Sequence, residues 1–323
     1  MNEDFARIVS DIPQIGIEWH GDTILENSRI NAVHVNQTVR DIPPTMQPII
    51  VVSAGPSLYR LKMLQRLKVS GFTGSVVATD GSYVQCLKAG IVPRYVVTLD
   101  PHPTRIVRWF GDPDFEANSA GDDYFFRQDL DEDFRKNAAE QNMLNIGLVN
   151  LFSMFTEVVI STTAPKNVVD RTKAFKRYWF VPLVDNPYSV QSLTRQMAKE
   201  TNAPAINTGG TVGTAAIMFA HTVLKAKKIG VIGMDLGYTS GMELERTQSW
   251  NMLKDKQNVD SYYITMNHPK WGPCYVDPTY FWYRQNLLGL LKSAGLTISN
   301  CSGSGTLYGP HVHCCELEEF VGG

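Results

Sequence analysis

Residues 207–238 read N-T-G-G-T-V-G-T-A-A-I-M-F-A-H-T-V-L-K-A-K-K-I-G-V-I-G-M-D-L-G-Y and predict a loop, a helix, a strand and a second loop. Gly209 and Gly210 allow a tight turn without a side-chain clash. Either Thr208 or Thr211 can cap the helix that follows, which is filled with small and apolar residues. The apolar run at 229–232 is typical of a strand in a covered parallel sheet. The stretch therefore predicts an α/β fold.

The beginning of this helix is also a candidate anion site. Free N–H groups at a glycine-flanked helix N-terminus suit a phosphate. Asp235 and Tyr238 follow the strand at its carboxyl end, which is where ligands bind in open α/β sheets. A tight turn without a ligand is the alternative, because Gly-Gly-Thr before a helix is common.

Three earlier apolar runs are predicted to be strands, and each ends in small or polar residues. They lie at 48–53, 74–79 and 95–99. The residues that follow them are Ala54, Gly55, Pro56 and Ser57 after the first, Asp80, Gly81 and Ser82 after the second, and Asp100 after the third. The carboxyl ends of parallel strands share one sheet edge, so we expect one site there. The sequence thus predicts a doubly wound, Rossmann-like fold with a mainly parallel sheet.

Two residues of this sheet edge, Ser57 and Asp80, each have a functional and a structural interpretation. Ser57 either donates to a phosphate or caps the helix predicted at 57–67. Asp80 either holds a ribose hydroxyl or forms a turn with Gly81. The G-x-G-x-x-G pattern is absent and Pro56 is foreign to it, which disfavours a dehydrogenase.

The composition excludes several classes of protein. A chain of 323 residues that is 43% hydrophobic can bury a full core. Its net charge of −2 gives no general attraction to nucleic acid or to an anionic membrane. No apolar run approaches the roughly 18–20 residues of a membrane span. The N-terminus does not resemble a secretory signal, and the five cysteines lack paired spacing, so we expect reduced thiols and a cytoplasmic location.

The rest of the chain is organised around this domain. We expect an N-terminal extension at 1–47, in which Trp19 and His20 serve packing, and a nucleotide-binding domain at 48–323 with a helical insertion at about 105–200. Acidic residues between 112 and 133 are interpreted as a solvated face. Further elements are expected as a strand at 157–161, mainly helix at 164–200, an irregular loop at 239–277, a helix at 278–294 and a strand at 296–300. His311 to Cys315 is assigned to packing, because its cysteine spacing does not suit zinc.

Several motifs together resemble a known family. They are S-A-G-P-S-L (53–58), T-D-G-S (79–82), V-T-L-D-P (97–101), G-G-T-V-G-T-A-A (209–216) and G-M-D-L-G-Y-T-S-G (233–241). They look like the motility-accessory-factor family, which includes the MptE-like archaeal 6-hydroxymethylpterin diphosphokinases. The resemblance runs from about residue 48 to the C-terminus, interrupted at 105–200. That family is similar in fold to bacterial sialyltransferases that use CMP-activated nonulosonic acids.

The sialyltransferase resemblance implies a role for each matching position. Residues 54–57 match the G-N-G-P-S donor loop, with Ala54 in place of its asparagine, and Asp80 falls near the asparagine that contacts the nucleotide. Residues 208–210 match a T-S-G loop. Residues 233–238 match G-I-D-F-Y, which makes Tyr238 a candidate to hydrogen-bond the leaving phosphate. His268 falls near the general-base histidine of H-Y-I-G-H-S, and a histidine suits a base at neutral pH. A structural histidine that caps its own loop is the equal alternative at this position. The sialyltransferase reading requires no metal.

Two other functions stay open. Pyrophosphoryl transfer from ATP to a pterin requires Mg²⁺, for which Asp80, Asp100 and Asp235 are candidate ligands. The third strand ends in T-L-D-P-H instead of the T-D-L-D of the pterin enzymes, so one carboxylate is missing and glycosyl transfer is favoured. A non-catalytic nucleotide-binding module is the remaining alternative. The sequence leaves open the donor, the glycan, protein or pterin acceptor, and whether the chain forms a homo-oligomer.

Overall fold

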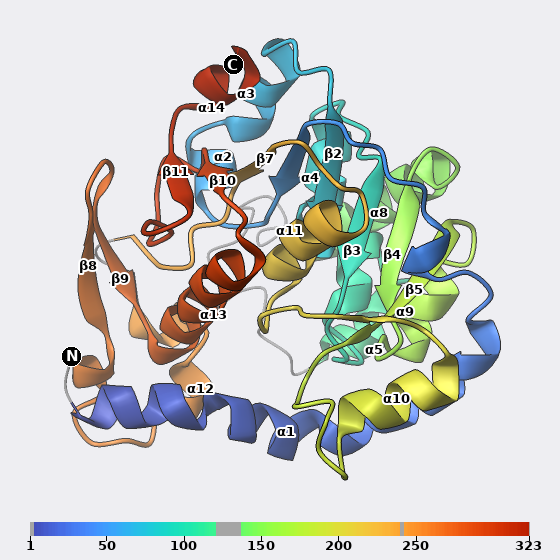
Figure 1. Cartoon of the computed structure of the whole chain (residues 1–323), viewed down its shortest axis with the longest axis horizontal. Helices are drawn as coiled ribbons and strands as arrows, with labels where there is room; N and C mark the ends of the chain where they lie inside the picture. Colours follow the sequence, from blue (N-terminus) through green and yellow to red (C-terminus); the bar gives the residue numbers. More distant parts are fainter. Residues whose placement is uncertain (1–2, 121–136, 240–241, 323) are drawn as a thin grey trace.

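The centre of the molecule is one parallel β-sheet (Figure 1). The computed structural model describes residues 3–120, 137–239 and 242–322. Nine strands of these residues pair in the order β11-β10-β7-β1-β2-β3-β4-β5-β6, and every pairing is parallel. Their bounds are β1 Ile49–Val52, β2 Ser75–Thr79, β3 Tyr95–Thr98, β4 Glu157–Ser161, β5 Lys176–Pro182, β6 Ala205–Ile206, β7 Ile229–Ile232, β10 Ile298–Asn300 and β11 Val312–Cys314. The predicted α/β fold with a parallel sheet is confirmed.

The strand order reverses between β1 and β7. From β1 the chain adds strands in one direction as far as β6, and it then returns to place β7 on the other side of β1. The crevice at such a reversal is the usual ligand site of open α/β sheets. The strands that flank it are fully buried, which explains their continuous apolar sequence.

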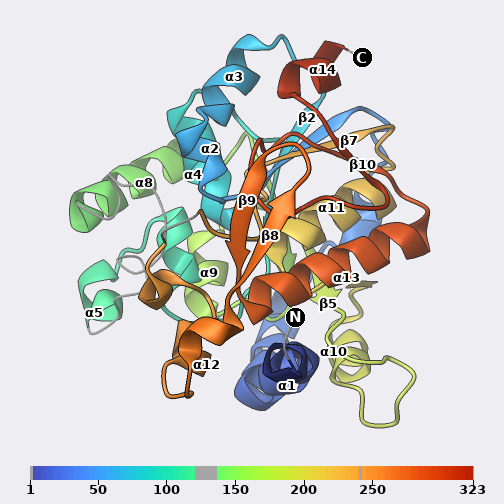
Figure 2. The same cartoon turned by 90° about the vertical axis from the view of Figure 1, so that its left-hand side faces the viewer.

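Helices cover both faces of the sheet (Figure 2). One face packs on α11 Val212–Thr222 and α13 Pro278–Ala294. The other packs on α2 Ser57–Arg60, α3 Met63–Val69, α4 Asp80–Lys88, α8 Ala138–Phe152, α9 Lys166–Arg171, α14 Leu317–Gly322 and the 3₁₀ helix η3 Ile106–Phe110. The remaining elements are η1 Ala32–His34, η2 Val39–Asp41, α5 Phe115–Ser119, α10 Leu193–Thr201, η4 Leu244–Arg246, α12 Trp250–Leu253, η5 Val259–Tyr262 and the antiparallel pair β8 Ile264–His268 and β9 Gly272–Val276.

A long helix, α1 Glu3–Asn31, precedes the sheet and lies along α10 and α13 (Figure 1). It is anchored at its two ends. Near its start the Phe5 ring meets Phe281 of α13 edge-on at 5.4 Å. At its end the Asn31 side chain donates hydrogen bonds to the carbonyls of Thr162 and Ala164, at 2.9 and 2.8 Å. The expected N-terminal extension is thus one continuous helix for most of its length.

Several expected elements are confirmed with their bounds. The strands at 157–161 and 229–232 and the helix at 278–294 lie where the sequence placed them. Asp277 caps that helix and Gly295 ends it with a φ of 60°. Local patterns suffice for these elements because their caps and apolar runs are continuous in the sequence.

Other expectations are wrong. The helix expected at 57–67 is broken into α2 and α3 by Lys62, which has a φ of 51°. The region at 164–200 is not mainly helical, since β5 occupies its middle, and 239–277 contains the β8–β9 hairpin. Asp112 is buried, and the acidic positions Asp122, Asp123, Asp129, Asp131, Glu132 and Asp133 lie outside the described residues. Within the described ranges, no helix is both long and apolar enough to cross a membrane.

Candidate functional site

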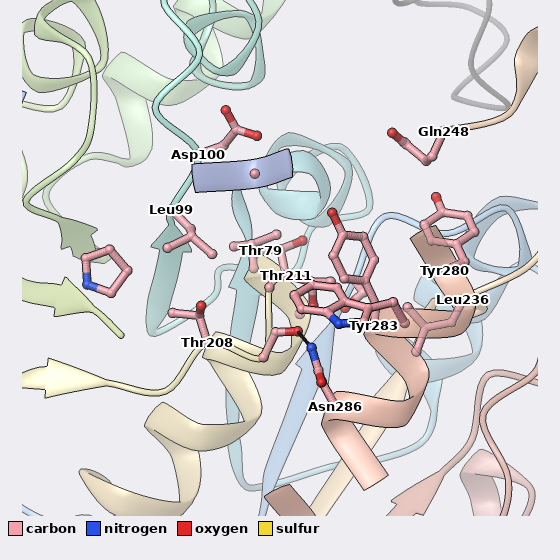
Figure 3. A pocket seen from close by; sticks show the side chains of 18 of the residues that line it. Thr79, Leu99, Asp100, Thr208, Thr211, Leu236, Gln248, Tyr280, Tyr283 and Asn286 are labelled. Carbon is pink, nitrogen blue, oxygen red and sulfur yellow. Dashed lines mark hydrogen bonds between the residues drawn. The ribbon is translucent and has the colours of Figure 1, made fainter. Parts of the chain in front are cut away.

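A cavity of about 900 Å³ lies at the carboxyl edge of the sheet, at the reversal between β1 and β7 (Figure 3). The loops that follow β1, β2, β3, β6 and β7 line it, together with parts of α1 and α13. Of the predicted site residues, it brings together Ala54, Gly55, Pro56, Asp80, Gly81, Asp100, Thr208, Gly209, Gly210, Thr211, Asp235 and Tyr238. Ser57, Ser82 and His268 are not part of its lining. The volume suits a small-molecule ligand.

The N-terminus of α11 points its first peptide groups at this cavity. Thr211 is the capping residue, because the Thr214 N–H donates to its side-chain oxygen at 3.0 Å. The N–H groups of Val212 and Gly213 are in no hydrogen bond of the described chain, and both residues line the cavity. Free N–H groups at a helix start carry partial positive charge and attract an anion. The start of α11 therefore stays a candidate phosphate position.

The loop after β1 differs from the start of α11, because two of its N–H groups bind acceptors within the protein. The Gly55 N–H donates to the Gly233 carbonyl at 2.7 Å, and the Ser57 N–H donates to Asp235 Oδ2 at 2.8 Å. A Cβ at Gly55 would lie 2.5 Å from the same carbonyl, so only glycine allows this approach. These two N–H groups join the loops after β1 and β7 and are not available to a phosphate. Ser57 is 2% exposed and Ser82, which donates to the Val52 carbonyl, is fully buried.

Asp80 is the most unusual charged group of the site. It begins α4 and is 4% exposed, and its Oδ1 accepts the Gly81 N–H at 2.7 Å. Its Oδ2 is buried from solvent and has no partner at normal hydrogen-bond geometry among the described residues, although the Thr98 side chain lies near enough to favour the ionised carboxylate. Burial, reinforced by the charge of Asp100, raises the pKa of Asp80 to about 7. A buried, shifted carboxyl in a cavity wall is typical of a functional position.

The Tyr238 hydroxyl is fixed by two hydrogen bonds within the protein. The hydroxyl donates to Asp277 Oδ2 at 2.9 Å and accepts the Gln248 N–H at 2.7 Å. Burial, together with the charge of Asp277, raises the pKa of Tyr238 well above its usual value. Its ring stacks on Tyr280 with 4.9 Å between centroids. Tyr238 therefore borders the cavity with its ring, while its hydroxyl binds the start of α13.

The structure separates His268 from the other predicted site residues. His268 ends β8, is 3% exposed and stacks on Trp271 at 4.3 Å. Its Nδ1 accepts the N–H groups of Lys270 and Trp271 at 3.0 and 3.1 Å, and its Nε2 lies 3.5 Å from the Cys314 sulfur. Burial lowers the pKa of His268. These contacts shape the β8–β9 turn and leave neither ring nitrogen facing the cavity.

We therefore expect His268→Ala to act on stability. The variant loses the acceptor for two N–H groups and the stacking on Trp271, which together cost on the order of 1–3 kcal/mol. Chemical denaturation measures this loss, and ligand affinity at the cavity should be unchanged. A stable His268→Ala protein with a large loss of turnover would restore the predicted base role.

The sequence reasoning missed the side chains that α13 and the preceding loop bring to the cavity. They are Gln248, Tyr280, Trp282, Tyr283, Gln285 and Asn286. Asn286 Nδ2 donates to the Gly209 carbonyl at 3.4 Å and joins α13 to the loop before α11 (Figure 3). The signal was present, since Tyr280, Tyr283 and Asn286 recur every three residues and so share one helix face. The cavity thus gains an aromatic and amide wall opposite the sheet edge.

The charges of the cavity are all acidic. Its lining includes Asp80, Asp100, Asp185 and Asp235, and no lysine or arginine occurs among the described residues that form it. The three carboxylates expected to bind Mg²⁺ do not form a ligand cluster, since the described residues contain no group of three His, Cys, Asp or Glu side chains placed to hold a metal ion. Any metal here would rest on ligand oxygens and at most two protein carboxylates.

Comparison with known proteins finds a matching family and a similar structure. The family described as 6-hydroxymethylpterin diphosphokinase MptE-like matches residues 22–115, which include the loops after β1, β2 and β3. The structure is similar to that of MAf glycosyltransferase from Magnetospirillum magneticum AMB-1, with a TM-score of 0.54 and 13% identity. The match covers 92% of this chain and 38% of that chain, so the likeness extends over a minor part of the larger protein. No curated protein matches the chain in sequence. The predicted resemblance to the MptE-like family and to a motility-accessory-factor glycosyltransferase is confirmed.

Proposed function

We propose that this chain is a transferase that binds a nucleotide-activated donor in the cavity, with glycosyl transfer from a CMP-nonulosonate as the favoured reaction. The observation that carries the proposal is the start of α11, where free N–H groups meet a cavity that has no cationic side chain among its described lining residues. The family match and the structural likeness support a transferase.

The charge balance favours a donor with one phosphate. The partial charge at a helix N-terminus is about +0.5, which suits a single phosphodiester. A diphosphate or triphosphate would bring more negative charge toward four aspartates without a lysine or arginine to offset it. A CMP-linked sugar carries one phosphate between nucleoside and sugar, and its transfer needs no metal ion.

The remaining parts of the site fit this donor. Asp80 lines the cavity at the end of β2, the position at which a carboxylate commonly holds a ribose hydroxyl. Tyr280 and Tyr283 offer ring faces and hydroxyls to the sugar, and N–H groups of α11 stabilise the departing phosphate. In this proposal Tyr238 is a positioning residue that fixes α13 through Asp277. The acceptor is a glycan or protein hydroxyl.

Pyrophosphoryl transfer from Mg-ATP to a pterin is the second candidate. It is supported by the description of the matching family and by the proximity of Asp80 and Asp100, whose charges interact. These two carboxylates would hold Mg²⁺ against phosphate oxygens, where the metal would neutralise the developing charge. The ring faces of the α13 wall suit a pterin as well as a sugar.

Ligand binding separates the candidates. Calorimetry and thermal shift should be measured with CMP, CDP, ATP, GTP and NAD, each with and without Mg²⁺. We expect CMP to bind without metal and to stabilise the fold by about 2.7 kcal/mol at 100 times its Kd. Binding of ATP that requires Mg²⁺ would favour the diphosphokinase instead. Binding of CMP without any CMP release from a CMP-sugar would indicate a non-catalytic module.

A further inference from the structure

The middle of α1 forms one wall of the cavity. The residues that line it are Ile12, Pro13, Gly16, Ile17, His20 and Ile24. They recur at intervals of about four and so lie on one face of the helix. No residue between positions 9 and 23 is fully buried, although both ends of the helix are anchored in the protein. The middle of α1 therefore faces the cavity without packing into a core.

The residues in the middle of α1 also have a low intrinsic helix propensity. Pro13 removes a backbone donor within the helix, and Gly16 and Gly21 each cost about 1 kcal/mol relative to alanine in a helix interior. A Cβ at Gly16 would meet no atom within 4 Å, so close packing does not explain the glycine. The open space beside Gly16 leaves room for a ligand to approach the backbone at this point.

His20 supplies the imidazole of this wall. The other titratable groups of the described lining are Asp80, Asp100, Asp185, Asp235, Tyr238, Tyr280 and Tyr283, and the charged neighbours of His20 on α1 are Glu18 and Asp22. Several of these are engaged: Asp185 accepts the Ser192 hydroxyl and the Leu193 N–H, and Tyr238 binds Asp277. His20 is exposed and lines the cavity, and it carries an imidazole, the side chain most often used as a general base.

We infer that α1 is the acceptor wall of the site and that His20 is the catalytic base, an inference that rests on the proposed glycosyl transfer. The acceptor hydroxyl binds between α1 and the α13 wall. Its O–H bond breaks as the proton passes to the His20 imidazole, and its oxygen forms a bond to the anomeric carbon. The bond from that carbon to the phosphate oxygen breaks, and the electron pair leaves with CMP. His20 then returns the proton to solvent.

The test uses the whole chain, with CMP as the binding probe and CMP-N-acetylneuraminate as the donor. Water serves as the acceptor, so that release of CMP reports proton removal without an identified acceptor. The variants are His20→Gln and, as a matched control, His34→Gln, an exposed histidine of η1 outside the cavity. We expect His20→Gln to bind CMP as the wild type does and to release it 10²–10⁴-fold more slowly. The rate of CMP release by His20→Gln should also no longer decrease at acidic pH, where a histidine base would be protonated. His34→Gln should match the wild type in the rate of CMP release and in its pH dependence.

The other possible results separate the base role of His20 from the proposed function. Unchanged CMP release and an unchanged pH profile in His20→Gln, with wild-type CMP affinity, overturn the base role and leave the proposed function standing. A wild-type chain that neither binds CMP nor releases it overturns the proposed function, and the inference with it. Loss of rate without a change in the pH profile overturns the base role and assigns His20 to positioning.

Discussion

Replacing Asp80 by asparagine should stabilise this protein at neutral and alkaline pH, by up to about 4 kcal/mol at pH 8. The reason is that burial raises the pKa of Asp80 to about 7 from a usual value of 3.8. Ionising the folded protein is therefore harder than ionising the unfolded chain. The cost is absent below about pH 4, grows between pH 4 and 7, and is constant above that range. Asparagine carries no charge, so Asp80→Asn removes this cost of ionisation.

The measurement is the free energy of unfolding of wild type and Asp80→Asn between pH 4 and 8. The difference should be near zero at pH 4 and reach its full value above pH 7. Asp255→Asn is the matched control, because Asp255 is exposed and lies outside the cavity lining, and it should change stability by less than about 0.5 kcal/mol. Parallel curves for wild type and Asp80→Asn would show that the carboxyl is not strained by burial. A gain in stability that comes with weaker CMP binding would indicate that the strain serves the ligand.

Asp277→Ala should be among the most destabilising single changes near the cavity, by on the order of 3–5 kcal/mol. The fully buried Asp277 carboxylate accepts the Tyr238 hydroxyl at 2.9 Å, the Ser249 N–H at 3.0 Å and the Tyr280 N–H at 2.8 Å. Alanine leaves all three donors without this acceptor and removes the cap of α13. That helix carries the aromatic wall, so cavity ligands should weaken as well.

Tyr238→Phe tests the same network from the other side. It should cost about 1–3 kcal/mol, because Asp277 loses a donor and the Gln248 N–H loses an acceptor. Tyr188→Phe, at a tyrosine that is 90% exposed, should have no measurable effect. Urea unfolding measures both, and CMP release measures function. If Tyr238→Phe kept full stability and lost turnover, the hydroxyl would act on the leaving phosphate, as the resemblance to sialyltransferases predicts.

Proximity along the sequence explains which parts of the site were predictable. The Thr211 cap, the glycines before it and the apolar helix that follows are contiguous, so the start of α11 could be located from local rules. Asp80 and Asp100 each follow a recognisable strand, and parallel strands bring their carboxyl ends to one edge. Both residues line the cavity for that reason.

Contacts between distant residues could not be predicted in this way. The Ser57 N–H binds Asp235, 178 positions later in the sequence, and this contact changes the role of the loop after β1. His268 has the neighbours of a catalytic base in sequence, but the β8–β9 turn folds its ring nitrogens onto Lys270, Trp271 and Cys314. Nothing in the local pattern distinguishes a histidine that faces a ligand from one that shapes a turn.

The sequence by itself determined the α/β class, the strands around the reversal, the start of α11 and the whole of α13, because periodicity and caps act within a few residues. Only the tertiary structure decided that α1 and α13 complete the cavity, that Tyr238 is bound to Asp277, and that His20 faces the cavity in place of His268. These outcomes depend on the packing of segments far apart in the chain, and short-range patterns do not encode how such segments meet.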